Sequence, residues 1–469
     1  MSSIRTRFAP SPTGTPDSVH LGFVIRALWN YAYAKKNGGQ FILRIEDTDI
    51  KRSRQDTEAA IFETLKKFGI SWDEGPDIGG PFGPYRQSER LTLYKEAALK
   101  LVKKGYAYYD FDAVKREKEE IKAVYESEEQ LAQLQIRPEA REQDPKVAQA
   151  RVDAGEPFVV RVKIPEDRVF EFYDWILKKK ISVLGKYVSD LIIFKSDGFP
   201  TYHLAVAVDD IAMQISHIFR GQEWISTTPI HLYMFEGLDH PIPQIGHFTV
   251  ILDKATNKKF SKRDLEGKFG VNHWLDRGYL PEAILNYLLL LGWAPKDNRE
   301  IFSLEEFVEA FDQDGVQKSN PIFDEKKLDW FNGHYIRSTD DSRLAQLVRP
   351  FLTREVSDEL LLKIIPLVKD RLVTLADFSA LTDFFFVAPG TVSDPAVNPE
   401  HLSYAVEQFD NLSSPDFVES VKAKGWKVGD FFMSIRLAIA GVRQTPPITE
   451  TMLVLGKEES IQRLKNAIT

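Results

Sequence analysis

The sequence predicts a Rossmann-like α/β domain with a parallel sheet, an inserted α+β domain within it, and mostly α-helical C-terminal domains. The first hundred residues alternate between strand and helix patterns, which is typical of a parallel sheet with crossover helices. This alternation stops after Tyr106, where short alternating strands follow, and it resumes near Leu191. From about Leu275 onward the pattern is almost wholly helical.

The first half of the parallel sheet is expected in residues 1–105. Apolar residues recur at helical spacing in its helices, and glycines such as Gly38 and Gly69 are typical helix stops. The expected elements are a strand at Ile4–Ala9, a helix at Leu21–Lys36, a strand at Phe41–Ile45, and helices at Arg54–Phe68 and Ser88–Lys104.

The inserted α+β domain is expected in residues 106–189, and the second half of the parallel sheet in residues 190–252. The insertion begins with a charged helical stretch, Ala113–Gln135. Its strands are expected at Phe158–Ile164, Val169–Ile176 and Ile181–Leu184. The resumed alternation predicts strands at Leu191–Phe194, Ile215–Phe219 and Gln244–Val250, and helices at Tyr202–Met213 and Ile225–Glu236.

Two helical domains are expected after the sheet, in residues 253–325 and 326–469. Pro350, Pro366 and Pro389 punctuate the second of them, and no internal repeat is present. A length of 469 residues suits about two to four domains.

The composition is that of a globular protein without sulfur-based cross-links. Hydrophobic residues make up 43% of the chain and charged residues 28%. There are no cysteines, which excludes disulfides, iron–sulfur clusters and cysteine-based zinc sites. The first motif begins close to Met1, so no signal or transit peptide is expected. The longest apolar run, Ala283–Trp293, is too short to span a bilayer.

The charge balance does not by itself favour a nucleic-acid partner. A net charge of −8 and a pI near 5.7 give no bulk attraction to RNA. An RNA contact would need local basic patches, for which Lys178–Lys180, Lys258–Lys268 and basic residues of the C-terminal third are candidates. Lysine clusters of this kind are more often solvated faces.

A turn with the sequence HLGF, from His20 to Phe23, opens the first predicted helix. Glycine lets the backbone approach a phosphate, and the helix N-terminus presents free N–H groups to it. His20 is placed to donate a hydrogen bond to a phosphate oxygen that gains charge in a transition state. The alternative is a histidine near a helix start, with Gly22 serving packing.

A basic loop, KKFSKRD from Lys258 to Asp264, follows the second half of the predicted sheet. A flexible loop with Lys259 and Lys262 can fold over a triphosphate and neutralise departing pyrophosphate, and Ser261 adds a hydroxyl donor. A solvated basic loop is the alternative for this segment alone. Its position after the sheet, together with the HLGF turn, favours nucleotide binding.

Two arginines, Arg7 and Arg220, are predicted at the carboxyl ends of strands, where open α/β sheets bind ligands. Arginine forks match carboxylates, so both arginines with an acid such as Glu46 suit a substrate with two carboxylates and one ammonium. An ordinary salt bridge is the alternative for each arginine, and a packing role is the alternative for Tyr202.

A metal site and a solvated helix start are both compatible with the acidic residues after Glu46. Asp47 and Asp49 could bind a cation. Arg52 and Arg54 follow them and could instead pair with nearby carboxylates.

Several segments of the chain occur together in one known family. They are RFAPSPTG, HLGF, ALWNYAYAKKNGGQFILRIEDTD, DEGPDIGGPFGPYRQSERLTLY, LIIFKSDGFPTYHLAVAVDD, IFRGQEW, KKFSKR and KLDWFNGHYIR. In these segments the chain resembles glutamyl-tRNA synthetases of the bacterial type, which are class I aminoacyl-tRNA synthetases. PYRQSER and IEDTD are specific to the glutamyl and glutaminyl branch, whereas APSPTG and the helical C-terminal third favour the glutamyl enzymes. The likeness covers roughly the first 340 residues.

The resemblance implies a role for each motif. Catalytic roles fall on His20, Gly22, Lys259, Ser261 and Lys262. Glutamate binding falls on Arg7, Ser11, Glu46, Tyr202 and Arg220, with Glu46 near the ammonium. ATP binding falls on His20, Gly22, Glu223, Leu252, Lys259, Phe260, Ser261, Lys262 and Arg263.

The sequence departs from the family at three places. Thr15–Val19 lengthens the connection between Gly14 and His20. Phe23 replaces a small residue, and Val206 stands where some relatives have a polar residue.

The domains take family roles as well. Residues 1–105 and 190–252 resemble the catalytic domain, 106–189 the acceptor-stem domain, 253–325 the KMSKS-type loop with a stem-contact domain, and 326–469 the anticodon-binding domain.

The function that the resemblance implies is that of a glutamate–tRNA ligase. Such an enzyme activates L-glutamate with ATP and Mg²⁺ and transfers it to the 3′ end of the glutamate tRNA. A cytoplasmic monomer is expected, with no membrane association, no resident metal and no zinc. Two alternatives stay open: a non-catalytic RNA-binding or scaffold relative, and a truncated relative that attaches glutamate to a modified tRNA base. Whether glutamine tRNA is also charged stays open too.

Overall fold

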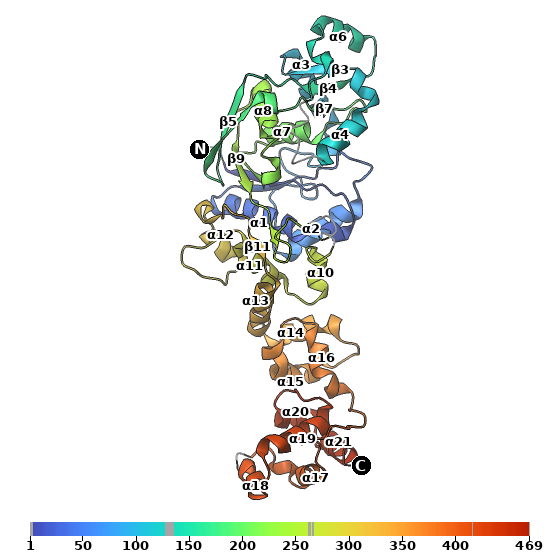
Figure 1. Cartoon of the computed structure of the whole chain (residues 1–469), viewed down its shortest axis with the longest axis vertical. Coiled ribbons are helices and arrows are strands. Elements are labelled where there is room, and N and C mark those ends of the chain that lie inside the picture. The colour runs from blue at the N-terminus through green and yellow to red at the C-terminus, as the bar shows by residue number, and fades with distance from the viewer. Residues whose placement is uncertain (1–2, 127–135, 261–263, 265–266, 415, 469) are drawn as a thin grey trace. The chain divides into compact units, whose positions relative to one another are not determined.

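The structure is a computed structural model that describes residues 3–126, 136–260, 264, 267–414 and 416–468. The chain forms two compact units, Met1–His273 with Leu285–Asp324, and Trp274–Ile284 with Glu325–Thr469. The first unit combines strands and helices, whereas the described residues of the second form helices and 3-10 turns (Figure 1).

All described strands belong to the first unit. They are β1 Arg5–Phe8, β2 Gln40–Leu43, β3 Ala107–Asp110, β4 Val159–Val162, β5 Val169–Asp174, β6 Lys179–Leu184, β7 Ile192–Phe194, β8 His217–Gly221, β9 Gln244–Phe248, β10 Leu252–Asp253 and β11 Ile322–Phe323.

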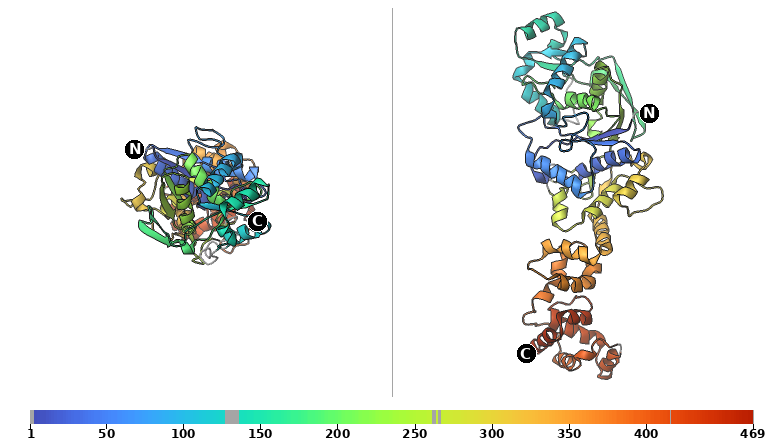
Figure 2. Two further views of the ribbon diagram at one scale, coloured as in Figure 1. Left: turned by 90° about the horizontal axis from the view of Figure 1, so that it is seen from above. Right: turned by 180° about the vertical axis from the view of Figure 1, so that it is seen from behind.

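Helices cover both units. Those of the first unit are α1 Leu21–Lys36, α2 Gln55–Lys67, α3 Leu91–Lys103, α4 Glu117–Glu126, α6 Pro145–Asp153, α7 Tyr202–Ala212, α8 Thr228–Gly237 and α12 Leu304–Ala310. The unit boundaries fall within α10 Val271–Asp276 and α11 Pro281–Leu291. Those of the second unit, orange to red in Figure 2, are α13 Glu325–Ser338, α14 Asp341–Val348, α15 Asp358–Val368, α16 Asp377–Phe386, α17 Pro399–Glu407, α18 Phe417–Ala423, α19 Val428–Ala440, α20 Ile448–Leu455 and α21 Lys457–Asn466.

Parallel strands from the two segments that the insertion separates in sequence lie side by side. β1 pairs with β2 in parallel, and β8 pairs with β9 in parallel. The backbone N–H of Ser216, just before β8, donates to the carbonyl oxygen of Arg5 over 3.0 Å, which brings β8 beside β1. The predicted Rossmann-like fold is confirmed, and the carboxyl ends of β1 and β8 lie at the same edge.

Two predicted strands have partners that differ from the expectation. Ile192–Phe194, expected to resume the parallel sheet, instead joins an antiparallel sheet of order β3-β4-β7. β5 of the insertion pairs in parallel with β9 and forms a hairpin with β6. A short strand pattern identifies an extended segment, but it does not say which strand lies beside it.

The charged stretch Ala113–Gln135, predicted as one helix, begins differently. It forms a 3-10 turn at Asp112–Lys115 and then α4, and residues 127–135 of this prediction lie outside the described residues. The sequence prediction lacks α6, whose N-terminus is capped by the Asp144 carboxylate accepting from two backbone N–H groups.

Each unit has its own apolar core. In the first, Leu101 of α3, Leu204 of α7 and Ile218 of β8 pack together in a buried cluster beneath the site described below. In the second, Phe431 and Leu464 are fully buried. Within the described ranges, no helix has the combination of length and apolar character needed to cross a bilayer.

Candidate active site

Arg7 of β1 belongs to a buried cluster of ion pairs. Its Nε lies 3.1 Å from Oδ1 of Asp210, on α7, and its Nη2 lies 3.2 Å from Oδ2. The same carboxylate accepts from Nη1 of Arg44 at 2.7 Å. Burial acts to raise the pKa of Asp210, but the two guanidinium groups outweigh it and the pKa falls. Arg7 is therefore held in place by a protein carboxylate.

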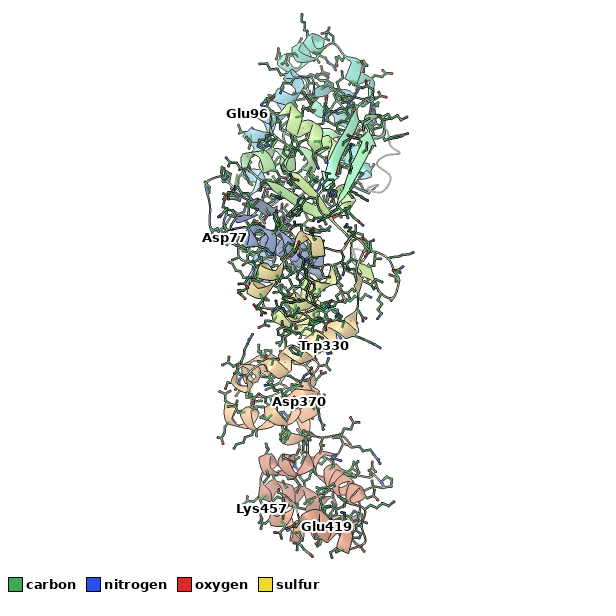
Figure 3. The ribbon with its side chains drawn as sticks, turned by 90° about the vertical axis from the view of Figure 1, so that its left-hand side faces the viewer. Asp77, Glu96, Trp330, Asp370, Glu419 and Lys457 are labelled. Carbon is green, nitrogen blue, oxygen red and sulfur yellow. The ribbon has the colours of Figure 1, made fainter. Side chains whose placement is uncertain are left out.

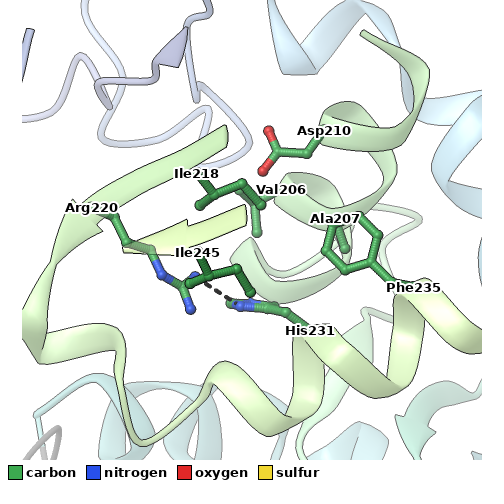
Figure 4. A pocket seen from close by; sticks show the side chains of 8 residues that line it. All are labelled: Val206, Ala207, Asp210, Ile218, Arg220, His231, Phe235 and Ile245. Carbon is green, nitrogen blue, oxygen red and sulfur yellow. Dashed lines mark hydrogen bonds between the residues drawn. The ribbon is translucent and has the colours of Figure 1, made fainter. Parts of the chain in front are cut away.

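Arg220, on β8, has only neutral hydrogen-bond partners among the described residues. Its Nε donates to Nε2 of His247 over 3.2 Å, and its Nη1 donates to Nδ1 of His231 over 2.8 Å (Figure 4). Its Nη2 donates to Oγ1 of Thr228 over 2.8 Å and to the carbonyl oxygen of Trp224 over 3.3 Å. Burial lowers the pKa of this guanidinium. Arg220 is thus oriented by neutral groups, and the carboxylate of Asp210 interacts with it electrostatically without a hydrogen bond among those described.

Glu46, after β2, lies near Arg44 and Arg7 in the buried ion-pair cluster. Its Oε1 is 3.3 Å from Nη2 of Arg44. Burial raises the pKa of Glu46 to about 7, although Arg44 and Arg7 both favour the ionised form. A further positive charge, such as an ammonium, would stabilise the carboxylate.

An aromatic stack and a small cavity lie next to Arg220. The ring of Tyr202, at the start of α7, stacks on Trp224 with centroids 4.2 Å apart and planes at 27°. Burial raises the pKa of Tyr202 to about 12, so its hydroxyl keeps its proton. The cavity has a volume of about 10 Å³, roughly the space for one water molecule. Its lining, drawn in Figure 4, comprises Val206, Ala207, Asp210, Ile218, Arg220, His231, Phe235 and Ile245.

His20 is the N-cap of α1. Its Nδ1 accepts a hydrogen bond from the backbone N–H of Gly22 over 3.1 Å. Burial, together with the nearby charges of Arg26 and Lys259, lowers the pKa of His20 to about 3, so the ring is neutral at pH 7. Because Nδ1 is the acceptor, Nε2 carries the proton and is the donor. The tautomer is therefore the one that the predicted phosphate contact requires.

The lengthened connection before His20, Thr15–Val19, is compactly folded. It forms a 3-10 turn at Pro16–Ser18, after which the backbone N–H of Leu21 donates to the carbonyl oxygen of Phe269 over 3.0 Å. The extra residues are accommodated before the helix, so they do not displace His20 from the helix start.

The structure describes Lys258–Phe260 and Asp264 of the basic loop. Lys259 is exposed, and its backbone forms a bridge with Leu252 of β10. Phe260 is buried and stacks on Phe269 with centroids 4.1 Å apart, and Phe269 in turn stacks on His20 at 5.8 Å. The base of the loop is thus packed next to the HLGF turn. The remaining predicted loop residues, Ser261, Lys262 and Arg263, lie outside the described residues.

Glu223 forms an ion pair with a residue that no motif marks. Its Oε1 lies 3.0 Å from Nη2 of Arg26, on α1. Burial acts to raise the pKa of Glu223, but Arg26 and Lys259 outweigh it and the pKa falls. The interactions bring Glu223, Arg26, Lys259 and His20 into one electrostatic environment. Ser11 is exposed in the loop after β1.

The acidic residues after Glu46 are engaged in the protein. Asp47 accepts from the backbone N–H of Ser88 at 2.8 Å and from its hydroxyl at 2.6 Å. Asp49 pairs with Arg52 at 2.5 Å. The arrangement is that of a turn cap and a solvated ion pair, the second of the two possibilities that the sequence left open.

Sequence reasoning missed the partners that orient Arg7 and Arg220. Asp210 has a local signal, because Asp209 and Asp210 are adjacent acids within an otherwise apolar helix. His231 and His247 have none, since a histidine among apolar residues is more often a core side chain. Their role is visible only once α8 and β9 lie beside β8.

Comparison with known proteins gives matches over the whole chain. Residues 3–330 match the family "tRNA synthetases class I (E and Q), catalytic domain", and residues 343–468 match "Anticodon binding domain". A "Glutamate--tRNA ligase" of Pseudoalteromonas translucida is 40% identical over 490 residues, which cover 99% of this chain and 95% of that protein. A second "Glutamate--tRNA ligase", from Thermus thermophilus, is 38% identical over 486 residues, 99% of each chain.

A solved structure is similar over its full length. The crystal structure of a glutamate tRNA ligase from Elizabethkingia meningosepticum, in complex with its amino acid, superposes with a TM-score of 0.87 at 35% identity. The alignment covers 100% of this chain and 99% of that one. Motifs, fold and full-length similarity agree, and the chain belongs to the class I aminoacyl-tRNA synthetases of the glutamyl and glutaminyl type.

Proposed function

We propose that this chain is a glutamate–tRNA ligase, which makes glutamyl-adenylate from L-glutamate and ATP and transfers the glutamyl group to tRNA. The observation that carries the choice of amino acid is Arg220, a buried cation whose described partners are all neutral. Such a cation favours the side-chain carboxylate of glutamate over the neutral amide of glutamine. Arg7 and Tyr202 complete the carboxylate sites, and Glu46 receives the ammonium.

Activation is a displacement at phosphorus. An α-carboxylate oxygen of glutamate attacks the α-phosphorus of ATP, and the bond from that phosphorus to the pyrophosphate oxygen breaks. No covalent enzyme intermediate is needed, so the protein acts by position and charge. His20 donates its Nε2 proton as a hydrogen bond to a phosphate oxygen, while Lys259 and Lys262 neutralise the leaving pyrophosphate.

Transfer to tRNA is an acyl displacement. The 2′-hydroxyl of the terminal adenosine attacks the activated carbonyl carbon, AMP leaves with the electrons of the carbon–oxygen bond, and the hydroxyl proton passes to the phosphate of AMP. At this step the protein again acts by orienting the reactants, since Arg220 continues to bind the side-chain carboxylate of the glutamyl group.

Magnesium is proposed as the cation that accompanies ATP. In nucleotide sites Mg²⁺ is held mainly by substrate phosphates and water, with one or two carboxylates. Glu223 suits such a contact, because its buried Oε2 has no hydrogen-bond partner among the described side chains.

The tRNA partner is assigned through the C-terminal region, whose match is to an anticodon-binding family. Charged side chains there are balanced locally: Lys457 pairs with Asp410 at 2.6 Å, and Lys422 pairs with Glu419 at 2.7 Å. Trp330 of α13, which precedes that match in the chain, has 46% of its surface exposed (Figure 3). We infer recognition of unpaired anticodon bases by stacking and hydrogen bonds rather than by bulk attraction.

The basic patch at Lys178–Lys180 is partly neutralised. Lys178 pairs with Asp314, and Lys180 pairs with Glu171 at 2.7 Å. The positive charge of Lys178–Lys180 is therefore weak support for RNA binding. The proposal that tRNA is the partner depends on the family match instead. We propose a cytoplasmic monomer acting on the glutamate tRNA.

The two alternatives have less support. The truncated relative that modifies a tRNA base lacks the helical C-terminal part, which is present here as residues 343–468. A silent scaffold would have no need of His20 in the donor tautomer or of an oriented, unneutralised Arg220.

Charging assays test the proposed function directly. Transcripts of glutamate tRNA and glutamine tRNA are each incubated with ATP and labelled glutamate or glutamine. We expect glutamate to be attached to glutamate tRNA and glutamine to neither. The glutamine tRNA arm decides whether the enzyme also misacylates that tRNA. Absence of glutamate transfer to either tRNA would contradict the assignment.

The KM for glutamate is expected to fall as the pH rises through about 7. Burial raises the pKa of Glu46 to about 7, so below that pH most of the free enzyme carries a protonated carboxyl. The substrate ammonium stabilises the ionised form, and binding therefore lowers this pKa. Affinity then rises with pH by up to about tenfold per unit below the pKa and levels off above it.

Charging kinetics from about pH 6 to 8.5 measure this dependence. Glu46→Gln is the matched control, because it keeps the size of the side chain and removes the titration. Its KM should be high and nearly constant over the same range. A wild-type KM that does not change with pH would contradict the role of Glu46.

A further inference from the structure

We propose that a buried hydrogen-bond chain, Asp174–His247–Arg220–His231–His203, orients Arg220 without neutralising it and thereby sets the preference for glutamate over glutamine. We call this chain the histidine relay. The inference rests on the proposed function and adds positioning residues to it. None of them lies in the motifs that mark the nucleotide site.

One arm of the histidine relay begins at Asp174, the last residue of β5. Its Oδ1 accepts from the backbone N–H groups of Ile176 at 3.1 Å and Leu177 at 2.8 Å, which fixes the carboxylate. Its Oδ2 lies 2.7 Å from Nδ1 of His247, on β9. A carboxylate only accepts, so Nδ1 of His247 carries the ring proton and Nε2 is left as an acceptor. Nε2 receives the hydrogen bond from Nε of Arg220.

The other arm runs through two helices. Arginine only donates, so Nδ1 of His231, on α8, must accept from Nη1 of Arg220 at 2.8 Å (Figure 4). The ring proton of His231 therefore sits on Nε2. Nε2 lies 3.2 Å from Nδ1 of His203, on α7, and donates to it. Every bond of the relay has a defined direction.

The environment keeps the relay histidines neutral. Burial lowers the pKa of His231 well below its usual value, and Arg220 lowers it further. Burial likewise lowers the pKa of His203 to about 3 and lowers that of His247, which Asp174 only partly offsets. A neutral ring is the only form that can accept from Arg220.

Neutral partners matter because of what Arg220 must bind. Arg7 faces Asp210, a carboxylate that balances its charge. An acid in the position of His231 would hold Arg220 equally well but would cancel the charge that distinguishes a carboxylate from an amide. Histidine acceptors orient the guanidinium fork and leave that charge for the substrate.

The decisive comparison is His231→Asn against His231→Asp. Both side chains place an oxygen near the position of Nδ1, and they have the same size, but only aspartate is charged. We expect His231→Asn to keep the glutamate KM within about fivefold of wild type, whereas His231→Asp should raise it by about 30-fold or more. The ratio of glutamate to glutamine activation should fall only for aspartate. KM for ATP, kcat and melting temperature are measured for both.

Asp174→Asn tests the direction of the other arm. An amide N–H facing Nδ1 of His247 would move the ring proton to Nε2, which would then point a donor at Nε of Arg220. We expect the glutamate KM to rise by about tenfold. If the relay acted only through charge, removing this anion would instead lower the KM. The two explanations predict opposite signs.

Nitrogen-15 NMR of histidine-labelled full-length protein reads the tautomers without any substrate. The expected result is a protonated Nδ1 on His247 and a protonated Nε2 on His231, both rings neutral at pH 7. The inference is overturned if either tautomer is reversed, or if the asparagine and aspartate variants at 231 have equal glutamate KM values. The expected tautomers could be observed while the wild-type enzyme attaches no glutamate to tRNA. That result would overturn both the proposed function and the role of the relay in selectivity, but it would confirm the hydrogen-bond geometry of the relay.

Discussion

Replacing Arg220 with glutamine is expected to raise the KM for glutamate by about 10–10²-fold and to leave the KM for ATP nearly unchanged. Glutamate and glutamine are nearly isosteric, so charge must separate them. The protein partners of Arg220 leave one N–H, on Nη1, for the substrate carboxylate. Losing this charge-assisted hydrogen bond costs about 1.5–3 kcal/mol. The preference for glutamate over glutamine should largely disappear, because glutamine never made this charged contact.

Arg168→Gln is the matched control for this change. Arg168 pairs with Glu236 at 2.6 Å and is partly exposed, so its loss removes a surface ion pair with little effect on stability or KM. Steady-state charging at saturating ATP gives the KM values, and a thermal melt verifies folding. If the folded Arg220→Gln enzyme had an unchanged KM for glutamate, Arg7 rather than Arg220 would be the residue that binds the side-chain carboxylate of glutamate.

Replacing Lys262 with alanine is expected to lower kcat for activation by about 10²–10³-fold, the usual cost of one donor aimed at developing charge, about 3–4 kcal/mol. The lysine meets its partner mainly as negative charge grows on the leaving pyrophosphate. Glutamate affinity should change little, since the proposed glutamate site lies on β1, β8 and α7. Steady-state charging at saturating glutamate and pyrophosphate exchange with tRNA measure the loss.

Lys254→Ala is the control for a lysine in the same region. Lys254 pairs with Asp324 at 2.5 Å and is exposed, so its removal should change kcat by less than about threefold. A loss of that small size for Lys262→Ala as well would contradict the assignment of this loop to the triphosphate.

Short-range patterns predicted the local structure well. The helix expected at Leu21–Lys36 is observed with the same bounds as α1, and the strand expected at Gln244–Val250 is observed as Gln244–Phe248. The position of His20 at the N-terminus of a helix was predictable, because the local strand–turn–helix pattern alone places the turn residue there. The fold class followed in the same way, since alternating helices and strands admit few topologies.

Pairing between distant segments required the tertiary structure. β7 carries a buried-strand pattern, and only the neighbouring β4 made it a member of the antiparallel sheet. Arg7 was predicted at a strand end, but its partner Asp210 lies 203 residues later. The assignment of individual residues to glutamate and ATP stays a prediction that the substitutions above test.

The sequence alone therefore determined the fold class, most helices and strands of the catalytic region, the two motifs and the family of this protein, because each is encoded in contiguous residues. Only the tertiary structure decided which arginine pairs directly with a carboxylate and which is held by neutral groups. Arg7 meets Asp210, whereas Arg220 meets His231 and His247. The physical reason is that the free charge of a buried arginine depends on its spatial neighbours, and these come from strands and helices that the sequence separates.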